Sequence, residues 1–174
     1  YSKALEYFEE VLKIRLSVYG ENHSRVASVY NDIGEIYSVQ GDDFKALDYF
    51  KKSLKIVLSV YGENHSQVSS IYDHIGEIYF AQKDYSKALY YFEESLKIRL
   101  SLFGENHPEV ALSYYSIGSL YIIQGDKSKA LNYYEKSLKI RLSVYGENHP
   151  LTKEIMDLIN VANSKVLQSP ETTK

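Results

Sequence analysis

Four histidines recur at a fixed spacing and are the first candidates for chemistry. His23, His65, His107 and His149 lie 42 residues apart, each at the end of a Leu-Ser-x-Tyr/Phe-Gly-Glu-Asn-His motif. Histidine is a common metal ligand and proton carrier. With one histidine per repeat, however, the side chains should lie at least a helix diameter apart, about 10 Å, which is too far to share one ion. We therefore expect them to shape corners between helices, and we expect no metal site.

The remaining groups do not form a catalytic pattern. His74 stands alone on a predicted helix, so we expect it to be solvated. The sequence has no cysteine, no G-x-S-x-G or H-E-x-x-H motif, and no phosphate-binding glycine loop. We therefore predict no enzyme activity and no cofactor. Many carboxylates are expected to pair with lysines one helical turn away, as in Glu9–Lys13, Glu93–Lys97 and Glu135–Lys139.

Composition places the chain among ordinary globular proteins. Its 174 residues are 44% hydrophobic and 25% charged, with a net charge of −3. These values exclude a polyanion-binding arm, a disordered chain and a membrane span. The absence of cysteine favours an intracellular, cytoplasmic location. The chain opens on Tyr1 within a helical pattern, so we expect a piece of a longer protein.

A periodic set of basic residues follows the predicted second helices and offers an alternative function. Binding of nucleic acid or an anionic membrane through this basic face would be sensitive to salt. Glutamates are interleaved with the basic residues and the chain is acidic overall, so we favour a solvated face with no nucleic acid and no membrane as partner. The set comprises Lys13, Arg15, Lys55, Lys97, Arg99, Lys139 and Arg141.

The elements that would carry these groups repeat with the same 42-residue period. Apolar residues recur at helical spacing, and each repeat divides into two helices separated by glycine. Asn22, His23 or Ser24 could cap the helix that follows the first corner. We predict an all-α single array in residues 1–167 and a disordered tail in 168–174. The array comprises a helix over 1–19, repeats over about 24–61, 66–103 and 108–145, and a capping helix over about 150–167.

Small residues indicate how the helices of a pair meet. Gly34, Gly76 and Gly118 lie in the middle of predicted helices, where glycine costs about 1 kcal/mol relative to alanine. Close approach of a neighbouring helix would offset this cost. We therefore predict tight packing against the following helix at each glycine.

The residues of one repeat resemble the tetratricopeptide repeat. The pattern is carried in the third repeat by Tyr114, Ile117, Gly118, Tyr121, Ala130, Tyr134 and Ser137. The period is 42 rather than 34 residues, and Leu58, Leu100 and Leu142 stand where the family usually has proline. Units of this length resemble those of kinesin light chains. The resemblance implies a right-handed α-α superhelical solenoid with three full helix pairs and a flanking helix at each end.

The same resemblance implies a protein- or peptide-binding groove lined by the first helix of each pair. In each repeat, one groove position follows the aromatic equivalent to Tyr30 by one residue. A second follows the mid-helix glycine by one residue, and a third lies three residues further on. They are Asn31, Glu35, Ser38, Asp73, Glu77, Phe80, Tyr115, Ser119, Ile122 and Asp157.

The groove positions predict the chemistry of the partner. They include four carboxylates and no lysine or arginine, which favours a basic segment. Phe80, Tyr115 and Ile122 would receive its large apolar side chains. A regulatory or oligomerisation domain of an enzyme outside this segment is an alternative function. We also predict weak self-association through the terminal helices, because Phe8, Leu12 and Leu16 have no preceding helix to cover them.

Overall fold

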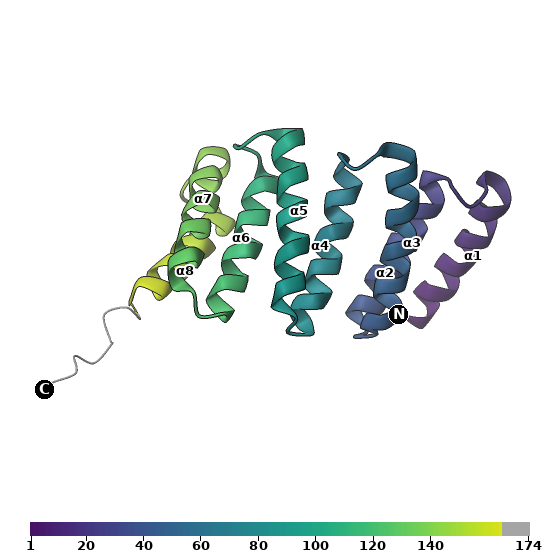
Figure 1. The fold of residues 1–174 in the computed structure, drawn as a ribbon, viewed down its shortest axis with the longest axis horizontal. Helices are drawn as coiled ribbons and strands as arrows, with labels where there is room; N and C mark the ends of the chain where they lie inside the picture. Colours follow the sequence, from purple (N-terminus) through teal and green to yellow (C-terminus); the bar gives the residue numbers. More distant parts are fainter. Residues whose placement is uncertain (165–174) are drawn as a thin grey trace, which may run out of the picture. The chain divides into compact units, whose positions relative to one another are not determined.

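The computed structural model describes residues 1–164, which contain eight α-helices and no strand (Figure 1). Helices account for 84% of these residues. None of them has the length and hydrophobicity needed to cross a membrane. The last predicted turn, at 165–167, and the predicted tail, at 168–174, lie outside the described residues. The helices are α1 (Ser2–Tyr19), α2 (Ser24–Val39), α3 (Asp43–Tyr61), α4 (Ser66–Ala81), α5 (Tyr85–Phe103), α6 (Pro108–Ile123), α7 (Lys127–Tyr145) and α8 (Pro150–Ser164).

The recurring histidines cap helices, as their position in the corners predicts. Gly20 ends α1 with φ 77°, a left-handed conformation that suits glycine, and its N–H donates to the carbonyl of Leu16. The Nδ1 atom of His23 then accepts the Arg25 N–H at 3.1 Å. Its ring stacks on Tyr19 with centroids 4.6 Å apart. Of the three capping candidates, the histidine is therefore the one used, and the same arrangement recurs at His65, His107 and His149.

A second kind of corner joins the two helices within each repeat. Asp42 caps α3 by accepting the Lys45 N–H at 3.2 Å, and its other oxygen lies 3.0 Å from Lys45 Nζ. The ammonium group of Lys45 also lies 4.8 Å from the ring centroid of Tyr37. The same arrangement of aspartate, lysine and tyrosine recurs before α5 and α7, so this corner is a regular feature of the repeat.

The mid-helix glycines admit an aromatic ring from the next helix. A Cβ atom added at Gly34 would lie 2.8 Å from Phe50 Cε1, and one added at Gly118 would lie 2.7 Å from Tyr134 Cδ1. Such separations are below van der Waals contact, so any larger residue would force the ring to move. Ser53 Oγ supports the same pair by donating to the Ala27 carbonyl at 2.9 Å. The predicted close approach is confirmed.

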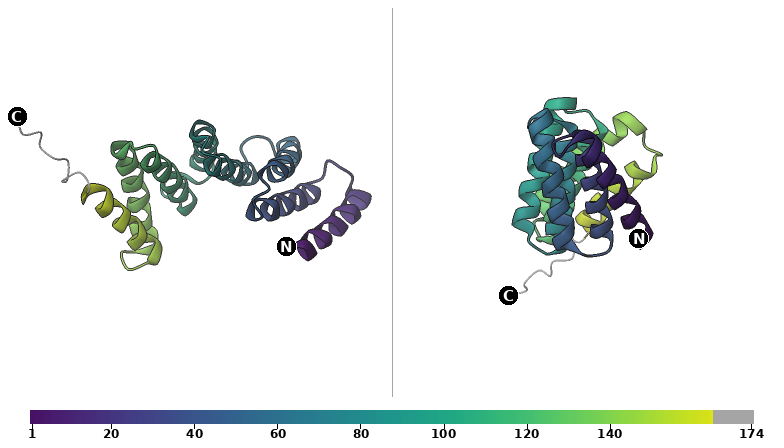
Figure 2. Two further views of the ribbon diagram at one scale, coloured as in Figure 1. Left: turned by 90° about the horizontal axis from the view of Figure 1, so that it is seen from below. Right: turned by 90° about the vertical axis from the view of Figure 1, so that its right-hand side faces the viewer.

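The described helices divide into two compact units, residues 1–102 and residues from Phe103 onward. Phe50 and Ile75 belong to the buried core of the first unit, and Ile117 and Ile155 are buried in the second. Figure 2 shows α2 beside α3 in the first unit and α6 beside α7 in the second. The single continuous array expected from the sequence stays a prediction.

Candidate partner-binding face

Two carboxylates from successive first helices come together in the first unit. The Nε2 atom of His74 on α4 lies 3.3 Å from Glu35 Oε1 on α2, and its Nδ1 atom lies 3.9 Å from Glu77 Oε2. The glutamate side chains are 49% and 69% exposed, so a ligand can reach them. Two groove positions predicted on different helices therefore belong to one charged cluster.

His74 is neither alone nor fully solvated, so that prediction is wrong. Its ring stacks on Phe50 with centroids 5.1 Å apart. Burial lowers the pKa of His74, but the nearby carboxylates of Glu77 and Glu35 raise it more, so the pKa lies above its usual value. His74 and Glu77 lie one turn apart on α4, a spacing that is visible in the sequence. Glu35 joins them from α2, and no local pattern indicates that contact.

Asp73 does not offer a free charge. Arg99 Nη2 of α5 lies 2.7 Å from Asp73 Oδ2. Burial raises the pKa of Asp73, and Arg99 and Ser95 offset only part of that rise. The neighbouring groove position, Asn31, donates from Nδ2 to Glu35 Oε1 at 2.5 Å. Glu35 and Glu77, rather than Asp73, therefore supply the accessible negative charge.

The prediction of a seven-residue basic row on a solvated face is wrong. Arg99 and Arg141 are each only 4% exposed. The Nη1 atom of Arg141 donates to the Leu151 carbonyl at 2.6 Å, and that of Arg15 donates to the Arg25 carbonyl at 2.6 Å. Residues two apart on a helix are rotated by about 200° around its axis, so they point to nearly opposite sides. The arginines therefore turn inward, while Lys13, Lys55, Lys97 and Lys139 stay exposed.

The other predicted positions of the first unit are less exposed. Phe80 is half-buried and packs edge to face against Tyr85, with ring centroids 5.9 Å apart. Ser38 is also half-buried. Phe80 follows Glu77 by one turn on the same helix, so an apolar ring lies next to the charged cluster.

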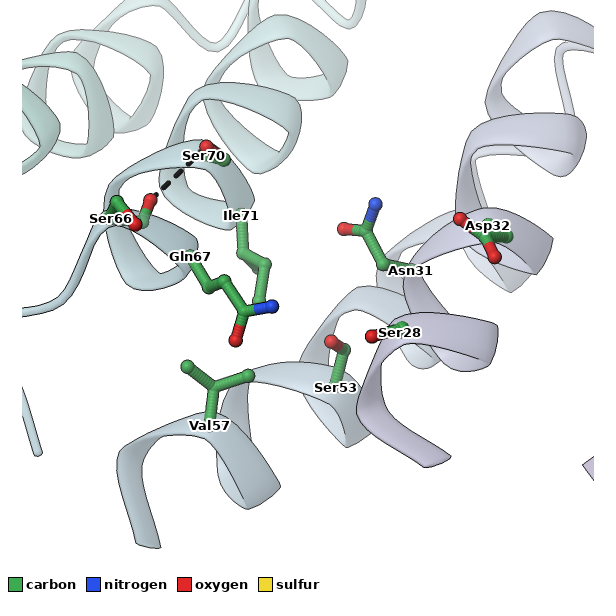
Figure 3. Close-up of a pocket in the computed structure, with 9 residues that line it drawn as sticks. All are labelled: Ser28, Asn31, Asp32, Ser53, Val57, Ser66, Gln67, Ser70 and Ile71. Atoms are coloured by element: carbon green, nitrogen blue, oxygen red, sulfur yellow. Dashed lines mark hydrogen bonds between the residues drawn. The ribbon is translucent and has the colours of Figure 1, made fainter. Parts of the chain in front are cut away.

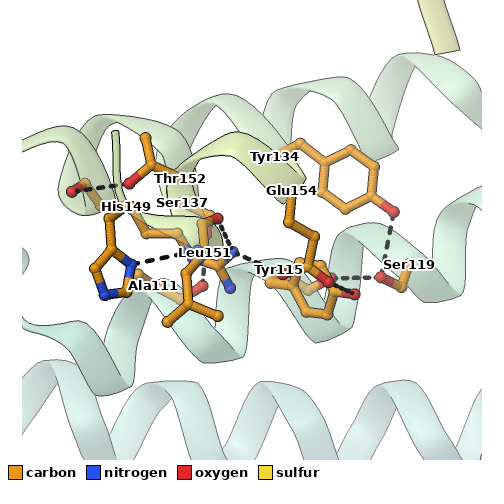
Figure 4. A network of polar contacts seen from close by, with 10 residues as sticks. Ala111, Tyr115, Ser119, Tyr134, Ser137, His149, Leu151, Thr152 and Glu154 are labelled. Carbon is orange, nitrogen blue, oxygen red and sulfur yellow. Dashed lines mark hydrogen bonds and ion pairs between the residues drawn. The ribbon is translucent and has the colours of Figure 1, made fainter. Parts of the chain in front are cut away.

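In the second unit Tyr115 belongs to a polar network (Figure 4). Its hydroxyl donates to Glu154 Oε1 at 3.1 Å, and the guanidinium carbon of Arg141 lies 4.9 Å from its ring centroid. Ser119 donates to the Tyr115 carbonyl at 2.9 Å and shares a hydrogen bond with the Tyr134 hydroxyl at 3.2 Å. Tyr115 is thus held in place by polar partners and is not a bare apolar anchor.

Ile122, a predicted apolar position, borders a pocket in the second unit. It lines this pocket of about 200 Å³ together with Leu158 and Val161 of α8. Sequence reasoning missed Leu158, although it is apolar where the equivalent residues Asp32, His74 and Ser116 are polar. Asp157, the remaining predicted position, is exposed on α8.

Metal chemistry has no support in residues 1–164, where no three histidine, aspartate or glutamate side chains are arranged to hold an ion. The four recurring histidines use their Nδ1 atoms to cap helices. What the arrangement offers is an exposed pair of carboxylates beside apolar side chains, which suits binding of cationic and apolar groups.

Solved structures share this fold at low sequence identity. BtubC (BKLC) from P. vanneervenii superposes with a TM-score of 0.78 at 20% identity, covering 99% of this chain and 77% of its own. A putative kinesin light chain from Podosopora anserina, with nearly identical TPR-like repeats, gives 0.72 at 15% identity over 97% and 89%. RapI in its apo form gives 0.79 at 18% identity over 94% of this chain and 57% of its own. These likenesses show the fold alone.

Sequence comparison supplies the family. No curated protein matches the chain. A family model described as tetratricopeptide repeat matches residues 1–59, 25–101 and 67–143, which together span most of the sequence. The repeated helix pairs, with a glycine facing an aromatic ring, agree with that match, and the 42-residue units are similar to kinesin light chain repeats. The chain therefore belongs to the tetratricopeptide repeat family.

Proposed function

We propose that this chain binds a basic segment of a partner protein on the face formed by α2 and α4. Tetratricopeptide repeats generally mediate contacts between proteins and act as non-catalytic scaffolds. The observation that carries the proposal is the pair of exposed carboxylates, Glu35 and Glu77, on either side of His74.

The electrostatics of this cluster favour a cation. Two carboxylates lie beside a single histidine, and their charges raise the pKa of His74, which supports a preference of this site for positive charge. A lysine or arginine of a bound segment would gain the same interactions without the desolvation cost that His74 meets. Salt would weaken this attraction because the carboxylates are exposed.

Apolar contacts would complement the charge. Phe80 lies one helical turn beyond Glu77 on α4 and would supply an apolar contact on the same face. We include Asn31, Ser38 and Asp73 as the surroundings of this contact. The predicted positions Tyr115, Ser119, Ile122 and Asp157 stay a separate prediction for the second unit. The partner segment is therefore proposed to carry one or two large apolar side chains beside its basic residues.

The test uses labelled peptides that are rich in lysine, contain no arginine and carry one leucine or phenylalanine. Fluorescence anisotropy should show binding that weakens with salt, whereas acidic peptides with the same apolar residue should not bind. Glu35→Lys with Glu77→Lys should weaken binding about tenfold or more, because charge complementarity becomes repulsion.

The matched control is Glu9→Lys with Glu93→Lys, which makes the same charge change at exposed positions on α1 and α5. It should leave affinity nearly unchanged. Asp73→Lys is unsuitable, because it would place a second cation beside Arg99. Tighter binding of the acidic peptides, or equal losses in both double variants, would refute the proposal.

A further inference from the structure

A polar pocket of about 280 Å³ lies between α2, α3 and α4 in the first unit (Figure 3). Asn31 and Asp32 line it from α2, Ser53 and Val57 from α3, and Gln67 from α4. It is far larger than the space needed by one buried water. Figure 3 shows Asn31 and Gln67 extending toward the space between the helices.

The repeats themselves show what normally occupies this place. Val57 is equivalent, at the 42-residue period, to Arg15, Arg99 and Arg141. In the second unit the guanidinium of Arg141 fills the equivalent space. It contacts the Leu151 carbonyl at 2.6 Å and Glu154 Oε2 at 3.5 Å, and it lies against the ring of Tyr115. The pocket exists because valine stands where the other three repeats have arginine.

Two acceptor atoms in the lining of the pocket have no donor as a partner. Asn31 Oδ1 and Gln67 Oε1 are shielded from solvent and have no hydrogen-bond partner. A buried acceptor without a partner is unfavourable, so a donor that enters would be stabilised. Guanidinium carries five N–H donors and no acceptor, which matches these two acceptors.

The charge near the pocket also favours a cation. Burial raises the pKa of Asp32, and the nearby Glu35 raises it further, while Arg15 lowers it only in part. An additional positive charge in the pocket would favour the ionised carboxylate.

We propose that this pocket receives an arginine side chain of the bound segment, which takes the place held by Arg15, Arg99 and Arg141 in the other repeats. This inference rests on the proposed function and deepens it by naming the recognised side chain. Arginine fits better than lysine because its planar fork can reach acceptors on two helices at once.

The first experiment uses argininamide as the probe and nitrogen-15-labelled protein. NMR should show shifts of the side-chain amide signals of Asn31 and Gln67 as argininamide is added. Lysinamide should give smaller shifts, and citrullinamide, the neutral analogue of the same shape, should give none. Equal effects of all three compounds, or shifts only at distant residues, would overturn the proposal.

The second experiment fills the pocket from within. Val57→Arg should abolish the Asn31 and Gln67 shifts, because the new side chain occupies the site as Arg141 does in its own repeat. Val60→Arg places the same charge on the exposed surface of α3 and should leave the shifts unchanged. If Val57→Arg does not fold, Gln67→Leu tests the same site by removing one acceptor.

A peptide pair separates this inference from the proposed function. Replacing one lysine of a binding peptide with arginine should increase affinity about tenfold through charge-assisted hydrogen bonds. Val57→Arg and Gln67→Leu should each remove most of that gain while leaving lysine-only peptides bound. If lysine-only peptides bind and arginine brings no gain, the pocket inference fails and the acidic face stands. If argininamide shifts Asn31 and Gln67 but no basic peptide binds, the pocket stands and the proposed function fails.

Discussion

The role of a groove residue depends on the side chain that faces it from the next helix. Asp73 and Tyr115 occupy equivalent positions in successive repeats, yet Asp73 forms an ion pair with Arg99 and Tyr115 lies against Arg141. Asn31, at the same position one repeat earlier, has no arginine at the corresponding place. Equivalent positions therefore differ in charge and accessibility.

His74 should make stability depend on pH. Its pKa in the folded protein lies above the usual 6.5. Its protonation therefore contributes stability that is fully present below about pH 6.5 and is lost as the pH rises through the folded pKa. In urea denaturation, the stability advantage of the natural protein over His74→Gln should be constant at low pH and should shrink as the pH rises above about 6.5.

NMR titration supplies the control for this prediction. Glu35→Gln with Glu77→Gln removes the charges that raise the pKa of His74, so its titration midpoint should fall. A midpoint below the ordinary histidine value in the natural protein would contradict the prediction. Deprotonation of His74 should also strengthen binding of lysine-rich peptides, because it removes a competing cation.

At the scale of the element, the helices pack through a glycine and an aromatic ring. A Cβ atom at Gly76 on α4 would lie 2.7 Å from Phe92 Cε1 and 2.8 Å from its Cδ1. Phe92 is only 4% exposed, so its ring has little room to move away. The contact sets how closely α4 and α5 approach within the first unit.

Gly76→Ala should therefore destabilise the protein. Alanine improves helix propensity by about 1 kcal/mol, but overpacking costs about 1–3 kcal/mol. We expect a net loss of about 1 kcal/mol in the free energy of unfolding, measured by urea denaturation. In the Phe92→Leu background the same change should cost less, because the ring is gone. A Gly76→Ala variant more stable than the natural protein would show that the Phe92 ring moves aside at little energetic cost.

At the scale of the whole molecule, α1 differs from the other described helices in having no buried residue. Ile14 and Val18 are 63% and 64% exposed, and Tyr7 lies on the same face. The sequence predicts the exposed apolar surface at Phe8, Leu12 and Leu16, but these residues are half-buried. The exposed apolar residues are instead Tyr7, Ile14 and Val18. An exposed apolar stripe on a terminal helix favours contact between copies of this chain.

We therefore predict weak self-association of this chain through α1. Light scattering should show a mass that rises with concentration, and Ile14→Glu with Val18→Glu should keep the protein monomeric. Phe44→Glu is the control, because Phe44 is 84% exposed on a different helix and its replacement should not change the mass. A constant monomer mass at high concentration would contradict the prediction.

The repeat period determined the helices, their glycine and histidine corners and the family, because these features depend on residues close together in the chain. Local hydrogen bonds and helical spacing are enough to specify them. The tertiary structure decided which charges a ligand meets. It placed His74 between Glu35 and Glu77, joined Asp73 to Arg99, and left a pocket at Val57. Apart from the His74–Glu77 contact within α4, these contacts join residues on different helices, so they depend on how side chains of neighbouring helices face one another. A period along one chain does not contain that information.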